Sequence, residues 1–168
     1  MSGHKQGKEN HRAKMKYHST MIILLDIDGV LNQLQGNYYI DKNCVRELSI
    51  ICKELNADIV LTSSWRIGYV NVGKCTPQIE ELKSIAKDNN INIIGRTRDL
   101  GNRSSEITTY IKEHEVSKYI IIDDDESEIS SELHERAYFI NCRTGITHKD
   151  VKNIIRRFGR WYQHVSNE

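Results

Sequence analysis

The chain has 168 residues, enough for one domain with a sizeable core. Apolar residues make up 38% and charged residues 28%, an ordinary balance for a water-soluble protein, and with a formal net charge of +1 the whole molecule is not an obvious polyanion binder. No stretch approaches the roughly 18 apolar residues of a membrane span, so we predict no membrane partner.

The first twenty residues differ from the rest in charge. They contain five lysines and arginines, one acidic residue and no apolar periodicity. We predict a disordered basic tail over residues 1–20 and a single domain over 21–165. The tail has two interpretations, contact with nucleic acid or a solubilising arm.

The four cysteines, Cys44, Cys52, Cys75 and Cys142, show no C-x-x-C spacing. No apolar run that resembles a signal peptide precedes Met21. We therefore expect reduced thiols and a cytoplasmic protein, with no zinc site.

The first half of the domain alternates short apolar runs with amphipathic segments. Met21–Asp26 is a continuous apolar run that ends in an acid, typical of a strand buried on both faces. A glycine-containing loop from Gly29 to about Tyr39 precedes a helix that Asp41 caps and that ends near Leu55. The next elements are a strand at 57–61, a loop at 62–76, a helix opened by Thr76 and Pro77, and a strand at 91–94.

The second half continues the alternation. A helix is predicted from Asn102–Ser105 to about His114, and the strand Tyr119–Ile122 then stops at a run of acids, Asp123–Glu126. A short helix at 127–133, a strand at 137–140 and a last helix capped by Thr147 complete the chain. Strands that alternate with helices predict an α/β fold, a three-layer Rossmann-like parallel sheet with helices on both faces.

Polar residues follow three of the predicted strands. The first strand ends at Asp26, the second at Thr62-Ser63-Ser64 and the fourth at Asp123-Asp124-Asp125. In open parallel sheets the ligand site lies beyond the carboxyl ends of the strands, so these groups should face one crevice. Carboxylates gathered there cannot all stay ionised without a cation, and magnesium takes such oxygen ligands.

The order of these segments resembles a known superfamily. Asp26-Ile27-Asp28-Gly29-Val30-Leu31-Asn32 resembles the first motif of the haloacid dehalogenase (HAD) superfamily of phosphatases. Leu61–Ser64 resembles its second motif, Arg103 its third and Ile120–Asp124 its fourth. The closest look-alikes are the HAD phosphatase modules of RNA and DNA end-repair proteins, of the polynucleotide kinase-phosphatase type. Two segments resemble the RNA-repair group in particular: Leu-Thr-Ser-Ser-Trp-Arg and Gly-Asn-Arg-Ser-Ser-Glu-Ile.

The resemblance implies specific roles. Asp26 would form an aspartyl-phosphate, and Asp28 would act as acid and base. Thr62 would hydrogen-bond a phosphoryl oxygen, and Arg103 would neutralise its charge. The implied Mg²⁺ ligands are the Asp26 carboxylate, the Asp28 backbone carbonyl, Asp123 and Asp124, the last directly or through water.

Several of these assignments have rivals. Ser63 replaces Thr62 if the second strand ends one residue later, and Asp125 can serve in place of Asp124. The rivals of Arg103 are Lys112, Arg96 and Arg98, all of which better suit a solvated surface.

The spacing of the motifs leaves no room for a large cap domain. Within the resemblance, an uncapped site implies a large substrate such as a nucleic-acid end, although a loop at 33–39 could act as a partial lid. Ser63, Trp65 and Arg66 are candidate substrate-binding residues, since an aromatic ring and a guanidinium can hold a base and a phosphate. The alternative is structural: Trp65 packs against its loop, and Arg66 forms an ion pair within the protein.

A second group of basic and aromatic residues lies near the C-terminus, and it suits either nucleic acid or a solvated helix end: Arg156, Arg157, Arg160, Trp161 and Tyr162. The sequence thus predicts a polynucleotide 3′-phosphatase, with DNA or RNA ends as partners. The alternatives are a small-metabolite phosphatase such as a 5′-nucleotidase, a phosphoprotein phosphatase, a phosphotransferase and an inactive binding module.

Overall fold

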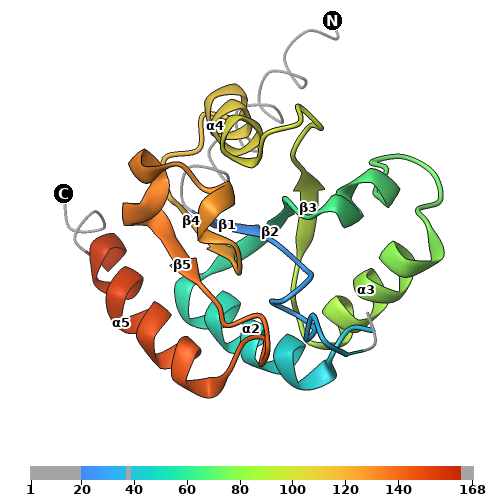
Figure 1. Cartoon of the computed structure of the whole chain (residues 1–168), viewed down its shortest axis with the longest axis horizontal. Coiled ribbons are helices and arrows are strands. Elements are labelled where there is room, and N and C mark those ends of the chain that lie inside the picture. Colours follow the sequence, from blue (N-terminus) through green and yellow to red (C-terminus); the bar gives the residue numbers. More distant parts are fainter. Residues whose placement is uncertain (1–19, 37–38, 164–168) are drawn as a thin grey trace, which may run out of the picture.

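The computed structural model describes residues 20–36 and 39–163, and the predicted basic tail at residues 1–19 lies outside them. Strands and helices alternate as predicted (Figure 1). The first half contains β1 (Met21–Leu25), α2 (Lys42–Leu55), β2 (Ala57–Leu61), the 3₁₀ helix η1 (Ser64–Gly68), α3 (Pro77–Asp88) and β3 (Ile93–Arg96). The second half contains α4 (Arg103–Glu113), β4 (Tyr119–Asp123), the 3₁₀ helices η2 (Glu126–Glu128) and η3 (Ser131–Arg136), β5 (Ala137–Phe139) and α5 (His148–Gln163).

The five strands form one parallel sheet in the order β3-β2-β1-β4-β5. Strand β1 is the central strand, and all five of its residues are buried. Leu25 at its end pairs with Leu61 of β2 and with Ile122 of β4. The carboxyl ends of the three central strands are therefore level, as a shared site at that edge requires.

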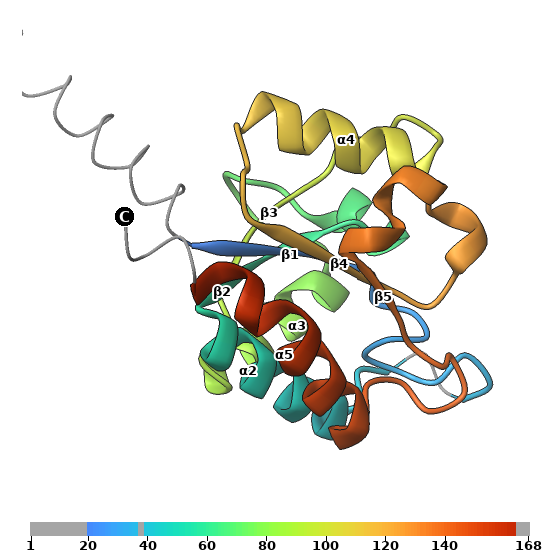
Figure 2. The same cartoon turned by 90° about the vertical axis from the view of Figure 1, so that its left-hand side faces the viewer.

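Alternate residues of the strands face two separate cores. Ile23 and Leu25 of β1 join the core beneath α2, α3 and α5, whereas Ile22 and Leu24 join the core beneath α4. Figure 2 shows the resulting three layers, with α4 on one face of the sheet and α2, α3 and α5 on the other. The predicted three-layer α/β fold is confirmed.

The strand predicted at 91–94 begins two residues later in the structure, because Ile91 belongs to the C-terminal cap of α3. Asn90 adopts a left-handed conformation at φ 56°, and the Ile91 N–H donates to the Ala86 carbonyl at 2.9 Å. This is a Schellman motif, in which the buried Ile91 packs back on the helix. Strand β3 therefore begins at Ile93.

Two other predicted segments also differ. The predicted loop at 62–76 contains η1, and the predicted helix at 127–133 is the pair η2 and η3. The described chain has no cap domain, since only loops and η1 separate β1 from α2 and β2 from α3. None of the helices in the described part of the chain has both the length and the apolar character to cross a membrane.

The predicted C-terminal basic cluster is partly engaged within the protein. Arg157 on α5 donates to the carbonyls of His134 and Glu135, each at 3.1 Å, so it ties α5 to η3. Arg156 and Arg160 are exposed. The side chains of Trp161 and Tyr162 lie outside the described part of the chain.

Candidate active site

The site is built at the carboxyl edge of the sheet, directly after β1. The backbone N–H of Asp26 donates to the Ile122 carbonyl at 2.9 Å, and that of Thr62 donates to the Leu25 carbonyl at 2.9 Å. Asp26 therefore lies one step beyond β1, between the ends of β2 and β4. Residues far apart in sequence meet here because parallel strands end at the same edge.

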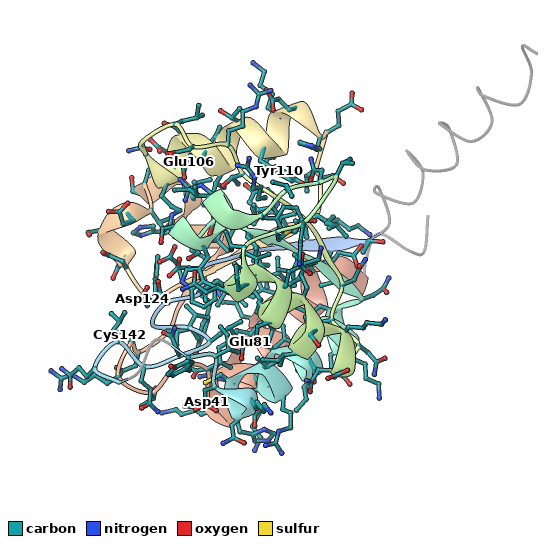
Figure 3. The ribbon with its side chains drawn as sticks, turned by 90° about the vertical axis from the view of Figure 1, so that its right-hand side faces the viewer. Asp41, Glu81, Glu106, Tyr110, Asp124 and Cys142 are labelled. Atoms are coloured by element: carbon teal, nitrogen blue, oxygen red, sulfur yellow. The ribbon has the colours of Figure 1, made fainter. Side chains whose placement is uncertain are left out.

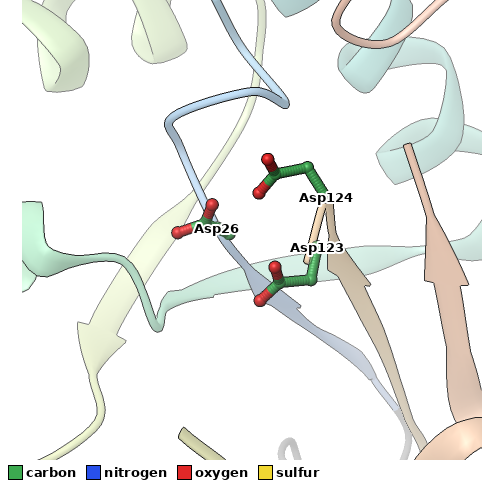
Figure 4. A group of neighbouring side chains, drawn as sticks. All are labelled: Asp26, Asp123 and Asp124. Carbon is green, nitrogen blue, oxygen red and sulfur yellow. The ribbon is translucent and has the colours of Figure 1, made fainter. Parts of the chain in front are cut away.

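Three carboxylates gather at this position. Asp26, Asp123 and Asp124 each offer an oxygen, and these oxygens all lie within 4.8 Å of one another (Figure 4). Asp26 and Asp123 are buried and Asp124 is half-buried. Among the described ion pairs, Arg103 supplies the one positive charge that contacts the cluster. Two negative charges therefore remain uncompensated when all three acids ionise. This donor set fits a hard divalent cation such as Mg²⁺.

The pKa values of all three acids reflect this crowding. Burial, followed by repulsion from Asp123, raises the pKa of Asp26 from 3.8 to about 8, although Arg103 opposes the change. Burial likewise raises the pKa of Asp123 and of Asp124 above the ordinary value. Without a metal ion the folded protein therefore favours protonated acids here.

Stability should consequently depend on pH and on magnesium. The folded protein retains a proton on Asp26 that the unfolded chain loses near its ordinary pKa of 3.8, so this contribution to the free energy of unfolding is present at low pH and is lost as the pH rises from about 4 to about 8. Mg²⁺ requires ionised ligands. It should therefore raise the Tm more at pH 8, near the upper end of that range, than at pH 5, near its lower end. Thermal melts with EDTA and with millimolar Mg²⁺ test this; an equal Mg²⁺ effect at both pH values would contradict it.

Arg103 enters the site from the first residue of α4. Asn102 caps this helix by accepting the Ser105 N–H at 2.9 Å. The Arg103 guanidinium donates to Asp26 at 3.2 Å and to Asp123 at 2.7 Å. It is thus placed where negative charge on a phosphoryl group bound at Asp26 would develop.

Gly29 allows Asp124 to approach the turn after Asp28. The φ of Gly29 is +78°, and a Cβ at this position would overlap the Asp124 carboxylate and approach the Cβ of Cys142 at 3.0 Å. Asp124 and Cys142, labelled in Figure 3, lie near each other on this side of the molecule. Only glycine meets both demands at this position.

Gly29→Ala should therefore weaken Mg²⁺ binding by about tenfold or more, since it displaces a ligand, and should lower the free energy of unfolding by about 1–3 kcal/mol. Gly101→Ala is the matched control, because Gly101 has a similar φ of +75° with nothing within 4 Å of its added Cβ. Isothermal titration with Mg²⁺ measures the difference. Equal Mg²⁺ affinities in the two variants would contradict the role given to Gly29.

Thr62 and Ser63 have different surroundings. The Thr62 side-chain hydroxyl is buried and has no hydrogen-bond partner among the described residues, which is costly for a polar group. The Ser63 hydroxyl accepts the Trp65 N–H at 3.3 Å and caps η1. Of the two rivals, Thr62 thus has the hydroxyl without a partner among the described residues, whereas Ser63 serves the turn.

The Asp28 carboxylate is held on both of its oxygens. Asn32 donates to Oδ1 at 2.9 Å, and the indole N–H of Trp65 donates to Oδ2 at 3.1 Å. The Asn32 side chain also accepts the Gly29 N–H at 2.9 Å, which fixes the turn. The Trp65 ring is half-buried against the core, so the predicted stacking of a substrate base on it stays a prediction.

The Arg66 side chain is engaged within the protein, and its predicted contact with substrate stays a prediction. Only 6% of Arg66 is exposed, and its guanidinium donates to the Thr62 carbonyl at 2.9 Å and to Glu106 at 2.8 Å. Asp99 completes the arrangement at 3.3 Å. Arg66 therefore holds η1 against α4, as the structural alternative proposed.

No described hydrogen bond or ion pair joins the side chain of a remaining rival to the acidic cluster. The Asp125 carboxylate caps η2 by accepting the N–H of Ser127 at 2.9 Å, while the Asp125 backbone N–H donates to Asp123 at 3.0 Å. Lys112 is exposed on α4, and Arg98 forms an exposed ion pair with Glu113. Arg96 donates to the Thr97 carbonyl at 3.4 Å.

Sequence reasoning missed two polar residues of the site, Asn32 and Glu106. Asn32 follows Asp28 by four residues in a glycine-containing turn, where an amide side chain commonly bonds nearby backbone. Glu106 lies three residues after Arg103 and four before the buried Tyr110, which is the spacing of a shared helix face. In Figure 3, Glu106 and Tyr110 are both labelled on α4.

Comparison with known proteins agrees with this geometry. A search of curated proteins found no match to the chain. The family described as "HAD domain in Swiss Army Knife RNA repair proteins" matches residues 22–151, which include every strand from Ile22 onward and all the acids of the site. The match spans most of the chain, and the chain therefore belongs to this family of HAD domains from RNA repair proteins.

Proposed function

We propose that the protein is a Mg²⁺-dependent phosphomonoester hydrolase that acts through an aspartyl-phosphate on Asp26, with a 3′-phosphorylated polynucleotide end as its substrate. The observation that carries this proposal is the position of Asp26. It lies beside the end of β2, where Thr62 follows the strand, and it pairs with Arg103 and clusters with Asp123 and Asp124. Nucleophile, cation and metal-ligating carboxylates thus share one site.

The reaction assigned to these residues has two steps. An Asp26 oxygen bonds to phosphorus as the ester bond breaks, and Asp28 gives its proton to the leaving oxygen. Asp28 then takes a proton from the water that attacks phosphorus, and inorganic phosphate leaves as the Asp26 carboxylate is restored. Arg103 and the Thr62 hydroxyl hold the phosphoryl oxygens throughout. A bound Mg²⁺, held by Asp26, Asp123, Asp124 and the Asp28 carbonyl, would neutralise phosphoryl charge.

The lack of a cap domain in the described chain supports a large substrate. Most of the large apolar side chains that are exposed in the described chain lie on the loops that follow β1, β2 and β3: Leu34, Tyr39, Ile67, Val70, Val72 and Leu100. A site that closed over small metabolites would cover such groups. Because the family consists of HAD domains from RNA repair proteins, an RNA end is favoured as the substrate.

A substrate panel tests the proposal. We expect Mg²⁺-dependent phosphate release from a 3′-phosphorylated RNA oligonucleotide, at a higher kcat/KM than from 5′-phosphorylated RNA or mononucleotides. The 3′-phosphorylated DNA of the same sequence separates RNA from DNA preference. Higher kcat/KM for mononucleotides would contradict the polynucleotide assignment, and no Mg²⁺-dependent release from any substrate would contradict the phosphatase assignment.

A further inference from the structure

The anchoring of Asp28 depends on a residue from another part of the chain. Trp65 lies 37 residues after Asp28, on η1 and not on the loop that follows β1. Its indole N–H is a donor only and does not titrate, so the contact at 3.1 Å places a fixed, neutral donor on Oδ2. Asn32 binds the other oxygen from within the same loop. The two donors together fix the plane of the carboxyl group.

Trp65 is itself held in place by the fold. Its backbone N–H bonds to the Ser63 hydroxyl, and its ring packs against the core beneath α2, α3 and α5. The next residue, Arg66, is tied to Glu106 of α4. The indole is therefore fixed on a turn that is anchored independently of the loop that carries Asp28.

We infer that Trp65 is a positioning residue for the proton transfer by Asp28, an inference that rests on the proposed function. Each carboxyl oxygen has a second lone-pair direction, so an anchored Asp28 can still carry and deliver a proton. Proton transfer requires close alignment with the leaving oxygen, and a carboxyl group free to rotate meets this alignment less often. Trp65 thus serves the catalytic acid and not the nucleophile.

This role predicts an effect that depends on the leaving group. An alkoxide, such as the 3′ oxygen of a ribose, needs a proton as the bond to phosphorus breaks. A 4-nitrophenolate is a stable anion and leaves without one. The second step, attack of water on the aspartyl-phosphate, is the same for both classes, so the difference should appear in kcat/KM, which reports the step in which the leaving group departs. Loss of the Trp65 N–H should therefore lower kcat/KM for the first class of substrate and spare the second, whereas general damage to the fold lowers both.

The experiment compares Trp65→Phe with the wild-type protein and with Tyr138→Phe. Phe keeps an aromatic ring and removes the N–H. Tyr138→Phe is the control, since it removes a side-chain hydrogen bond to Asp150 at 3.0 Å on β5 and α5, away from the acidic cluster. With Mg²⁺ saturating, W65F should lower kcat/KM on a 3′-phosphorylated oligonucleotide by about 10–100-fold and on 4-nitrophenyl phosphate by about twofold or less. Y138F should change kcat/KM on neither substrate. An equal loss of kcat/KM on both substrates in W65F would overturn the inference.

A second measurement tests the contact without relying on the fold of W65F. In ¹H–¹⁵N spectra of the full chain, Asp28→Ala should move the indole N–H resonance of Trp65 upfield; an unmoved Trp65 resonance would overturn the inference. A wild-type protein inactive on both substrates would contradict the phosphatase proposal, and the positioning role would fall with it. An active wild-type protein with equal losses in W65F would contradict the positioning role alone.

Discussion

Asp26→Asn should reduce phosphate release by roughly 10⁴-fold or more in kcat, because the amide cannot form the covalent intermediate. The loss should be similar for oligonucleotide and aryl phosphate substrates, since both require the nucleophile. Phosphate release under saturating Mg²⁺ measures it. Asp26→Asn retaining a tenth of the wild-type kcat would refute covalent catalysis by this residue.

The same substitution should stabilise the magnesium-free protein. Burial and the neighbouring Asp123 raise the pKa of Asp26 to about 8, so near neutral pH folding must return a proton to a group that is ionised in the unfolded chain. A neutral amide removes this cost. The Tm in EDTA at pH 7 should therefore rise, by about 2–4 °C for each kcal/mol gained in a domain of this size.

Asp125→Asn is the matched control for both measurements. It is the same chemical change in the same acidic run, but Asp125 caps η2 and lies outside the cluster of Asp26, Asp123 and Asp124. It should leave kcat nearly unchanged and change the Tm little, because asparagine accepts the capping hydrogen bond about as well as aspartate. An opposite ordering of the two variants in Tm would contradict the electrostatic account of the site.

The parts of the molecule that follow local patterns were predictable from sequence. Strand β1 is continuously apolar because both of its faces are covered, and Asp41 caps α2 by accepting the Asn43 N–H as a helix-capping aspartate does. The meeting of Asp26 with Asp123 followed from the parallel alternation of strands and helices alone.

The parts that depend on partners distant in sequence were not predictable. Nothing local to Trp65 and Arg66 indicates that one donates to Asp28 and the other to Glu106, 37 and 40 residues away. An aromatic ring and a guanidinium after a strand end suit a ligand as well as they suit the protein itself. For Arg66, the position of α4, which presents Arg103 to the acids and Glu106 to Arg66, explains its use within the protein.

Glu106→Ala should lower the free energy of unfolding by about 3–5 kcal/mol, the usual cost of leaving one charge of a buried pair alone. Its partner is Arg66, and the side chains of Arg66 and Glu106 are 8% and 2% exposed. Glu106 also accepts the Leu100 N–H at 3.0 Å. Arg66 would keep only the Thr62 carbonyl and Asp99, a partner that is 59% exposed. Chemical denaturation measures the loss.

Glu113→Ala separates this effect from the loss of any ion pair on α4. Its pair with Arg98 is largely exposed, at 38% and 69%, so its removal should cost less than about 1 kcal/mol. Equal losses in the two variants would contradict the structural role of Arg66. Glu106→Ala should also lower kcat/KM on oligonucleotides more than on 4-nitrophenyl phosphate, because the released η1 carries Trp65 away from Asp28. The buried pair therefore connects the stability of the fold to the acid that the reaction needs.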